Sequence, residues 1–367
     1  MEIRLFKIDE ITLLMESIHR IWAKNHILSV DEQLVRFMFY DNPNRKLLTD
    51  DDHITFVGAW IDGKVVGLLG AMPFEFNDCG KKGLAITLAN WIVDPDYRDS
   101  GAGLALLDFV QAFNPNIILA MGLSEEAAKL YKLMRWSFIE DIPRWIGLNN
   151  KELTIQAILN GNEQPLRYVE SLKVLEVNSS LSCFEIASLQ EEEWEQFNNS
   201  FFAKGSIGIK RDFQFINWRY FKHPTFNYRK FVCKDSSGIT GLLIVRIELI
   251  QSKYKIGRIV EFIAKNQDSA VKLAIELVAL DSEILFYDFY CYSSISSWGL
   301  EAIGFKRTFT SEEDLFMLPT RFQPIDYLNT KLMTAMYISD KQTYRLNHIA
   351  DQLWYITKGD ADQDRPN

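Results

Sequence analysis

The chain has 367 residues, of which 47% are hydrophobic and 24% charged, and it carries a net charge of −9. This length favours two domains over one core, and the composition is that of an ordinary globular protein. The acidic balance argues against a surface built for nucleic-acid phosphates, so we expect no nucleic-acid partner.

No uncharged apolar run reaches the roughly 18 residues that a membrane-spanning helix needs. The first ten residues mix charges with apolar side chains, unlike a signal peptide. We therefore expect no membrane insertion. The cysteines are Cys79, Cys183, Cys233 and Cys291, with no CxxC pair and no nearby histidine. This spacing predicts reduced thiols in a cytoplasmic protein and no metal site.

Strand-like and helix-like segments alternate in residues 1–150, and Asp62-Gly63 gives a strong hairpin signal. The order predicts a mixed α/β sheet, antiparallel at first and parallel later. We expect a strand at 3–8, helices at 11–22 and 31–40, strands at 54–61, 64–76 and 84–93, a helix at 104–113, a strand at 117–122, a helix at 125–134 and a strand pair within 138–148.

Residues 151–178 show little pattern and are interpreted as a connector. The element order then repeats within residues 179–325, which predicts a duplicated fold. Residues 326–367 are predicted as a helical segment and a charged tail that is disordered from residue 357 onward. In the second half we expect a strand at 182–188, helices at 191–202 and 212–221, strands at 229–234, 239–250 and 256–264, a helix at 269–280, a strand at 284–292 and a last segment at 298–305.

The sequence NWIVDPDYRDSGAGL, Asn90–Leu104, combines a strand, a turn and a glycine-containing helix start. Arg98, Gly101 and Gly103 have the spacing RxxGxG. The first turn of a helix has unpaired N–H groups and a positive dipole end, and glycine lets a phosphate approach them. The pattern therefore predicts a pyrophosphate cradle, although RxxGxG alone is also compatible with a simple helix entry.

These residues resemble the GNAT superfamily of acyl-CoA-dependent N-acyltransferases. VDPDYRDSGAG, Val93–Gly103, is similar to the family's cradle motif, and SEEAAKLYKLMRW, Ser124–Trp136, resembles its second motif, NxxAxxLYxxxGF. Two departures are Ser124 in place of asparagine and Arg135 in place of glycine. The resemblance implies two tandem GNAT-like domains with acetyl-CoA or another acyl-CoA as co-substrate. The implied CoA-binding residues are Trp91, Ile92, Val93, Arg98, Asp99, Ser100, Gly101, Ala102, Gly103, Leu104 and Ser124.

The resemblance implies that Tyr131 donates a proton to the leaving thiolate of CoA, which a phenol protonated at neutral pH can do. Packing on an amphipathic helix is the alternative for this residue. Glu75 and Asn90 are candidates near the acceptor amine. Glu75 is predicted as base or as a solvated carboxylate, and Asn90 as a group that holds water or the acceptor.

The second half lacks the cradle, because AKNQDSA, residues 264–270, stands in its position and Leu300 replaces the tyrosine. We interpret it as a degenerate GNAT-like domain that closes over the acceptor. Trp218, Arg219 and His223 are candidate substrate-binding residues there, with core packing as the alternative, preferred for His223. Charged residues of the tail could also bind sugar hydroxyls or an amine, namely Asp360, Asp362, Asp364 and Arg365.

The expected activity is acetyl-CoA-dependent N-acetylation of a small polar amine such as an amino sugar, free or nucleotide-linked. This acceptor follows from a resemblance to two-domain proteins of surface polysaccharide synthesis. A Fem-type aminoacyl transferase and a non-catalytic binding protein are the alternatives. The sequence leaves acyl chain length open, and the protein is expected to be a monomer or a homodimer.

Overall fold

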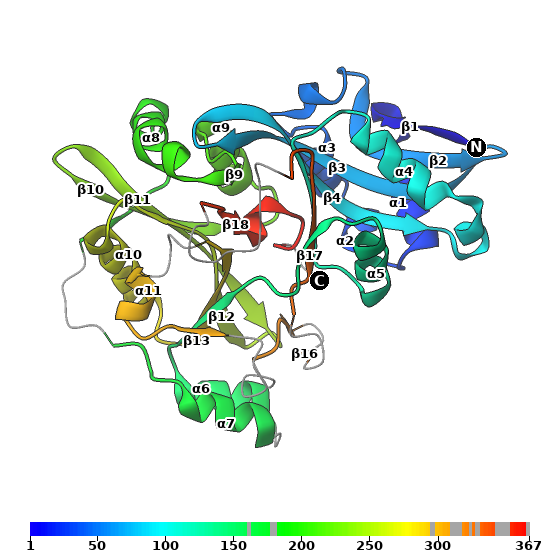
Figure 1. Cartoon of the computed structure of the whole chain (residues 1–367). Coiled ribbons are helices and arrows are strands. Elements are labelled where there is room, and N and C mark those ends of the chain that lie inside the picture. The colour runs from blue at the N-terminus through cyan, green and yellow to red at the C-terminus, as the bar shows by residue number, and fades with distance from the viewer. Residues whose placement is uncertain are drawn as a thin grey trace.

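The computed structural model describes residues 1–159, 163–176, 182–293, 298–308, 318–322, 325–326, 331–341 and 353–364. The chain is an α/β protein with two large mixed sheets, as predicted (Figure 1). No helix in the described part of the chain is both long and apolar enough to cross a membrane.

The first sheet holds the elements predicted for the N-terminal half. The turn between its second and third strands has positive φ at both Asp62 (50°) and Gly63 (78°), as a two-residue hairpin requires. In spatial order its strands are β1 (Glu2–Lys7), β2 (His53–Ile61), β3 (Lys64–Asp78), β4 (Lys81–Val93), β5 (Ile117–Met121), β17 (Thr334–Ile338) and β6 (Ser137–Ile139), while β9 (Ile207–Ile209) pairs with β3.

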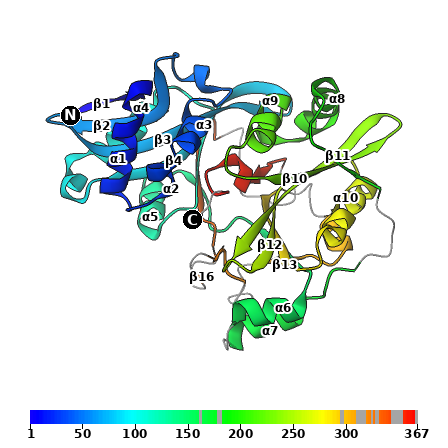
Figure 2. The same cartoon turned by 180° about the vertical axis from the view of Figure 1, so that it is seen from behind.

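Helices cover both faces of this sheet. On one face lie α1 (Ile11–Ile21), the short α2 (Ile27–Val30) and α3 (Glu32–Phe39), in front of the sheet in Figure 2. The opposite face carries α4 (Ala102–Gln111) and α5 (Glu125–Leu133), which lie in front in Figure 1. The sheet therefore separates two apolar clusters, one with Leu14 and Phe39 and one with Leu106.

The second sheet has the same sequence of antiparallel strands followed by a parallel neighbour. In spatial order its strands are β14 (Lys306–Thr308), β7 (Arg144–Leu148), β13 (Ile284–Tyr292), β12 (Tyr254–Ala264), β11 (Gly238–Ile250), β10 (Tyr228–Asp235) and β8 (Phe184–Glu185), while β18 (Ile356–Thr357) pairs with β13. A small separate sheet pairs β15 (Arg321–Phe322) with β16 (Ile325–Asp326).

The helices of the second half follow the predicted order. The segment interpreted as a connector also forms helices, whose apolar side chains, such as Ile158 and Val169, pack against Leu148 and Phe286 of the second sheet. The helices are α6 (Lys151–Thr154) with a π-helical turn at Ile155–Leu159, α7 (Glu163–Ser171), α8 (Glu191–Phe197) continued by a π-helix at Asn198–Phe202, α9 (Phe213–Ile216) continued by a π-helix at Asn217–Phe221, α10 (Gln267–Leu280) and α11 (Trp298–Ala302).

The two halves exchange strands, which the predicted boundaries at 150 and 325 did not anticipate. β6 and β7 do not pair with each other, because β7 lies between β13 and β14 in the second sheet. In return, β17 lies between β5 and β6 in the first sheet. Alternation of apolar and polar residues indicates a strand, but it does not determine which other strand that strand pairs with.

The prediction of a helical segment and disordered tail at 326–367 was wrong for the described residues. Besides β17, the segment contains β18 and a 3₁₀ turn at Lys358–Asp360. Asp360, Asp362 and Asp364 are buried, and the segment runs between the two sheets (Figure 1). Arg365 lies outside the described residues.

Candidate active site

The first sheet opens between its two central parallel strands. β4 and β5 pair from Ala85–Ile117 as far as Leu88–Ala120, yet β4 continues to Val93. Among the described residues, no strand pairs with this last part of β4 on the side of β5. Its other edge pairs with β3, where Ile92 lies opposite Leu68 and Val93 opposite Gly67. The backbone of Trp91–Val93 can therefore receive an extended, amide-containing ligand as a strand would.

A bulge in β4 marks the point where the strands separate. Asn90 has a φ of 50°, and the pairing of β4 with β3 shifts register between Leu68 and Gly70. Positive φ is uncommon outside glycine but is tolerated by asparagine. The Asn90 side-chain nitrogen lies 3.5 Å from Nε2 of His26, in the segment before α2. Asn90 thus faces the helices that lie opposite α4 and α5.

The loop after β4 is fixed by Asp94, which is buried. Its carboxylate pairs with Arg20 at 2.7 Å and Lys64 at 3.1 Å and accepts from the N–H of Asp96. Burial raises the pKa of this carboxyl, but these partners together outweigh burial and hold the pKa below its ordinary value. The following 3₁₀ turn, Pro95–Ser100, is thereby held in place.

Gly101 begins the helix that follows the predicted cradle. Its φ of 78° lies in the left-handed region, which a side chain would strain. Helix α4 starts at Ala102, so the N–H groups of its first turn have no preceding helical carbonyl to bond. Beside this turn, Arg98, Asp99, Ser100 and Gly101 are exposed. An exposed helix start with a flanking arginine is an arrangement that suits a phosphate.

Trp91 connects Tyr131 on α5 with the start of α4 at Gly103. The indole Nε1 of Trp91 donates to the carbonyl oxygen of Gly103 at 3.1 Å. The ring centroids of Trp91 and Tyr131 are 5.2 Å apart, and those of Tyr131 and Trp136 are 4.6 Å apart. Burial raises the pKa of the Tyr131 phenol far above its ordinary value. The phenol therefore stays protonated at physiological pH.

The helix that carries Tyr131 is well defined at both ends despite the two departures from the family motif. At its start the Ser124 hydroxyl accepts from the N–H of Ala127 at 3.2 Å, as an N-cap does. At its end Arg135 adopts a φ of 58°, the left-handed conformation that glycine usually supplies. The Arg135 carbonyl accepts from the Lys341 ammonium. The C-terminal cap thus forms without glycine.

Glu75 is held by lysines from two parts of the chain. Its carboxylate lies 3.2 Å from the ammonium of Lys82 on β4 and 2.7 Å from that of Lys210, just after β9. The backbone N–H of Lys210 also donates to the Glu75 carbonyl oxygen at 2.9 Å. These contacts favour a role in joining β9 to β3 over a role as a general base.

The second sheet separates at the corresponding place, but the chain itself fills the opening. β12 and β13 pair in parallel as far as Ile259–Phe289. Beyond that point β18 pairs with β13, with Thr357 opposite Cys291. On the other side the hydroxyl of Tyr355 accepts from the N–H of Phe262 on β12 at 3.1 Å. The C-terminal segment thus lies where an extended ligand would lie in the first sheet.

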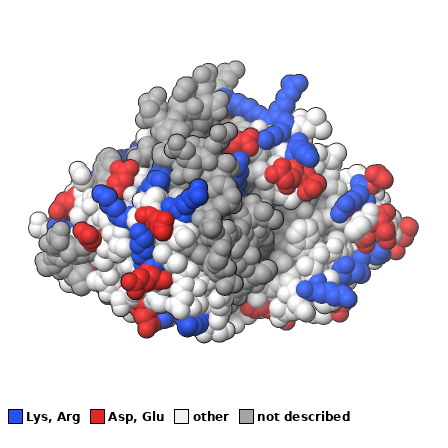
Figure 3. Space-filling view, turned by 90° about the horizontal axis from the view of Figure 1, so that it is seen from below, with Lys and Arg blue, Asp and Glu red and all other residues white. Residues whose placement is uncertain are grey.

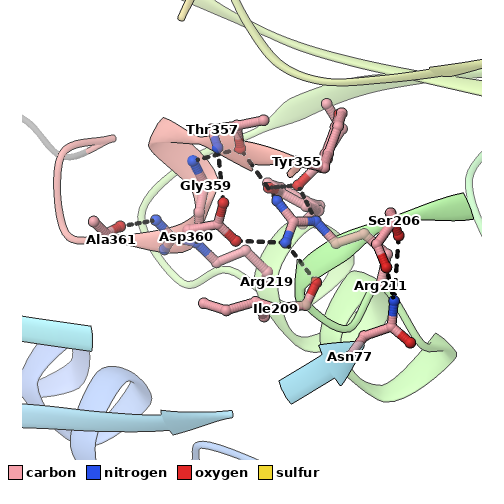
Figure 4. A network of polar contacts seen from close by, with 12 residues as sticks. Asn77, Ser206, Ile209, Arg211, Arg219, Tyr355, Thr357, Gly359, Asp360 and Ala361 are labelled. Atoms are coloured by element: carbon pink, nitrogen blue, oxygen red, sulfur yellow. Dashed lines mark hydrogen bonds and ion pairs between the residues drawn. The ribbon is translucent and has the colours of Figure 1, made fainter. Parts of the chain in front are cut away.

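A buried ion-pair network holds this segment (Figure 4). Arg211 and Asp360 form an ion pair, and both are inaccessible to solvent. The Arg211 guanidinium also contacts Glu261 at 3.0 Å and donates to the Thr357 hydroxyl at 3.3 Å. Glu261 in turn accepts from the phenol of Tyr355 at 2.9 Å. Every charge in the network therefore has a partner of opposite sign or a hydrogen bond.

The predicted substrate-binding cluster takes part in the same packing. The Trp218 indole donates to the Phe37 carbonyl at 3.2 Å, and Arg219 donates to the carbonyls of Gly359 and Ala361 at 3.2 and 3.0 Å. Nδ1 of His223 accepts two backbone N–H bonds. Because all three side chains form hydrogen bonds inside the protein, the geometry does not support the prediction that these residues bind substrate. It supports the packing alternative.

The same segment reaches the opening in the first sheet. Nε2 of Gln363 donates to the carbonyl of Met121, the last residue of β5, at 3.1 Å. A Cβ on Gly122 would lie only 2.3 Å from Oε1 of Gln363, so the two are in close contact. No sequence signal indicates this contact, because the tail has the composition of a disordered segment.

Comparison with known proteins agrees with this geometry. Residues 15–134, which include the first motif and the second as far as Met134, match the acetyltransferase (GNAT) family. Residues 15–134 thus form a domain of the GNAT type. No curated protein matches the sequence significantly.

Solved structures show the same fold at low identity. A GCN5-related N-acetyltransferase from Anabaena variabilis has a TM-score of 0.53 and 13% identity, over 92% of this chain and 73% of that one. A probable N-acyltransferase from Enterococcus faecalis gives 0.54 and 12%, over 93% and 73%. Saccharomyces cerevisiae N-myristoyltransferase with bound myristoyl-CoA gives 0.51 and 9%, over 91% and 82%. The match therefore extends across both halves.

Proposed function

We propose that the chain transfers an acetyl group from acetyl-CoA to the amino group of a small polar acceptor, with the acyl-CoA bound in the first sheet. The observation that carries this proposal is the opening between β4 and β5, followed in the chain by the helix start at Gly101–Gly103, where Gly101 is exposed. Its backbone and helix N–H groups match the two parts of CoA, the amide-containing arm and the pyrophosphate. The amine would attack the thioester directly.

In this proposal Tyr131 protonates the leaving thiolate. The phenol is buried against the aromatic rings of Trp91 and Trp136, and its raised pKa keeps it protonated. Asn90, on the bulge beside the opening, would hold a water or the acceptor amine. Because Glu75 is paired with two lysines, we assign it no base role, and an amine that arrives partly neutral needs none.

We further propose that the second half takes no acyl-CoA. Its opening is filled by β18 and Tyr355, and its corresponding helix α10 is capped by the Asn266 side chain instead of an open glycine turn. In the segment that fills it, Gln363 lies beside the last residue of β5. The second half would thus form one wall of the acceptor site of the first.

For the acceptor we propose an amino sugar, free or nucleotide-linked, handled by a cytoplasmic enzyme of polysaccharide synthesis. The net charge of −9 suits a cationic amine. Basic and acidic side chains are interspersed on the face in Figure 3, which does not favour the aminoacyl-tRNA required by the Fem-type alternative.

Two measurements test this function. Acetyl-CoA at about 100 times its dissociation constant should stabilise the native protein by roughly 2.7 kcal/mol and raise its melting temperature. An amine screen that detects free CoA thiol should then identify the acceptor. No melting shift with acetyl-CoA or longer acyl-CoAs would rule out the proposal, whereas a shift without thiol release from any amine would favour a non-catalytic binding protein.

A further inference from the structure

Two of the cysteines, distant in sequence, are neighbours across two strands of the second sheet. Cys183 directly precedes β8, and Cys233 lies in β10. The two strands are antiparallel, with Phe184 opposite Val232 and Glu185 opposite Phe231. One further step in this register places Cys183 opposite Cys233.

The hydrogen bonds between β8 and β10 show whether Cys183 and Cys233 occupy a hydrogen-bonded or a non-hydrogen-bonded position. The N–H of Ile186 donates to the carbonyl of Lys230 at 2.8 Å, which marks that position as hydrogen-bonded. Because hydrogen-bonded and non-hydrogen-bonded positions alternate along antiparallel strands, Cys183 and Cys233 occupy a non-hydrogen-bonded position. Cα atoms in such pairs are about 4.5 Å apart, within the range of about 4.4–6.8 Å that a disulfide spans.

The thiols are in contact and chemically unequal. A hydrogen bond between the two sulfurs has the largest effect on the pKa values of both thiols. It lowers the pKa of Cys233 to about 6 and raises the pKa of Cys183. The hydroxyls of Thr240 and Ser269 and the ammonium of Lys272 also favour the Cys233 thiolate. Thiolate character of this kind is what makes a cysteine reactive in disulfide exchange.

The two sulfurs differ in their exposure to solvent. Cys233 is buried, whereas Cys183 is half-buried. Cys183 is positioned by its backbone N–H, which donates to the Glu276 carboxylate on α10 at 3.0 Å. A small reagent can therefore reach Cys183 first, with Cys233 directly behind it.

We propose that Cys183 and Cys233 form a redox-active dithiol that closes to a reversible disulfide in exchange with a low-molecular-weight disulfide such as oxidised glutathione. Cys183 passes its proton to the Cys233 thiolate, attacks the external disulfide as a thiolate and releases one glutathione thiolate. The Cys233 sulfur then gives that proton to the released glutathione thiolate, attacks the mixed disulfide at Cys183 and releases the second glutathione as a thiolate. The two protein sulfurs, which share one proton, are oxidised to a disulfide, and the external disulfide is reduced to one thiol and one thiolate.

The bond would fasten an edge strand that is otherwise weakly held. β8 is the last strand of the second sheet and pairs with β10 at two positions only. The disulfide would close a long loop between Cys183 and Cys233, and closing such a loop restricts the unfolded chain. The oxidised form should therefore melt several degrees higher than the reduced form and revert on reduction.

The test uses the full chain equilibrated with mixtures of reduced and oxidised glutathione, followed by alkylation of free thiols and peptide mass spectrometry. The expected product has lost two hydrogens and links Cys183 to Cys233. Cys233→Ser should trap glutathione on Cys183, because the second attack is lost, and Cys79→Ser should close the bond as the wild type does.

Free thiols at both positions under fully oxidising mixtures would overturn the proposal. So would a stable mixed disulfide on Cys183 in the wild type, or a link to Cys79 or Cys291. None of these readouts involves acyl transfer, so they do not depend on the proposed function.

Discussion

The indole of Trp91 packs on the ring of Tyr131, with centroids 5.2 Å apart, while its Nε1 donates to the carbonyl of Gly103. One side chain thus joins the start of α4 to the phenol on α5. This contact brings together the two sequence motifs, which are separated along the chain.

Tyr131→Phe should preserve acetyl-CoA affinity and lower kcat at least tenfold, because only the proton donor is removed and the ring remains. Since burial raises the pKa of the phenol, wild-type kcat should show no loss from ionisation of Tyr131 as the pH rises to about 10. Steady-state kinetics across pH and CoA binding to both proteins measure this. Equal kcat in the variant would remove Tyr131 from the mechanism.

Gly103→Val should weaken acetyl-CoA binding more than tenfold, or by over about 1.4 kcal/mol, while the protein remains folded. A Cβ at Gly103 would meet Val93 at 3.4 Å and Trp91 at 3.7 Å, which are ordinary contacts, so the native packing accepts it. The methyl groups of the introduced valine would obstruct the approach of a phosphate to the start of α4. Gly205→Ala, at an open position with nothing within 4 Å, is the matched control. Unchanged affinity in Gly103→Val would argue against phosphate binding there.

Arg98→Ala should reduce CoA affinity by only about three- to tenfold, because Arg98 is exposed and the backbone N–H groups provide most of the binding. The difference from wild type should shrink at high salt, since exposed charges are screened. Titrations at low and high ionic strength measure both effects. A complete loss of binding would assign Arg98 a larger role than the structure supports.

Asp360→Asn should destabilise the protein by roughly 3–5 kcal/mol, because Arg211 would keep a buried charge with one partner fewer. Glu140→Gln removes the carboxylate of an exposed ion pair with Lys132 and should cost less than about 1 kcal/mol. Urea unfolding of both variants provides the comparison. Similar stability in the two would mean that the C-terminal segment does not hold the halves together.

His223 predicts a specific pH dependence of stability. Burial and the neighbouring Arg219 lower the pKa of its imidazole to about 3, against about 6.5 in the unfolded chain. The unfolded state then binds the extra proton, so this contribution is complete above about pH 6.5 and is lost as the pH falls toward 3, by up to about 1.4 kcal/mol per unit.

His223→Asn keeps an acceptor for the N–H groups of Thr225 and Phe226 but does not titrate. The free energy of unfolding should therefore fall less between pH 7 and 5 in this variant than in the wild type. His19→Asn, on the exposed face of α1, serves as the control. Parallel pH dependence in the wild type and His223→Asn would show that His223 is not buried neutral.

The sequence predicted most elements and the strand, turn and helix start around Gly101, because their signals are local. The turn at Asp62-Gly63 and the glycine at 101 each require a conformation that few other residues adopt. Element order also indicated the second sheet, although RxxGxG is missing there.

The long-range pairings escaped prediction. Nothing in the pattern of β7 or β17 says which sheet each joins, and Cys183 and Cys233 come together only through strand register. The charged tail was interpreted as disordered because its partners, Arg211 for Asp360 and Arg246 for Asp364, lie far away in the sequence.

The central claim is that one chain binds one acyl-CoA, in the opening between β4 and β5. Calorimetric titration of acetyl-CoA into wild type and Gly103→Val tests it most directly. We expect one site per chain in the wild type and a loss of that site in the variant. Two sites per chain, or one site that survives Gly103→Val unchanged, would contradict it.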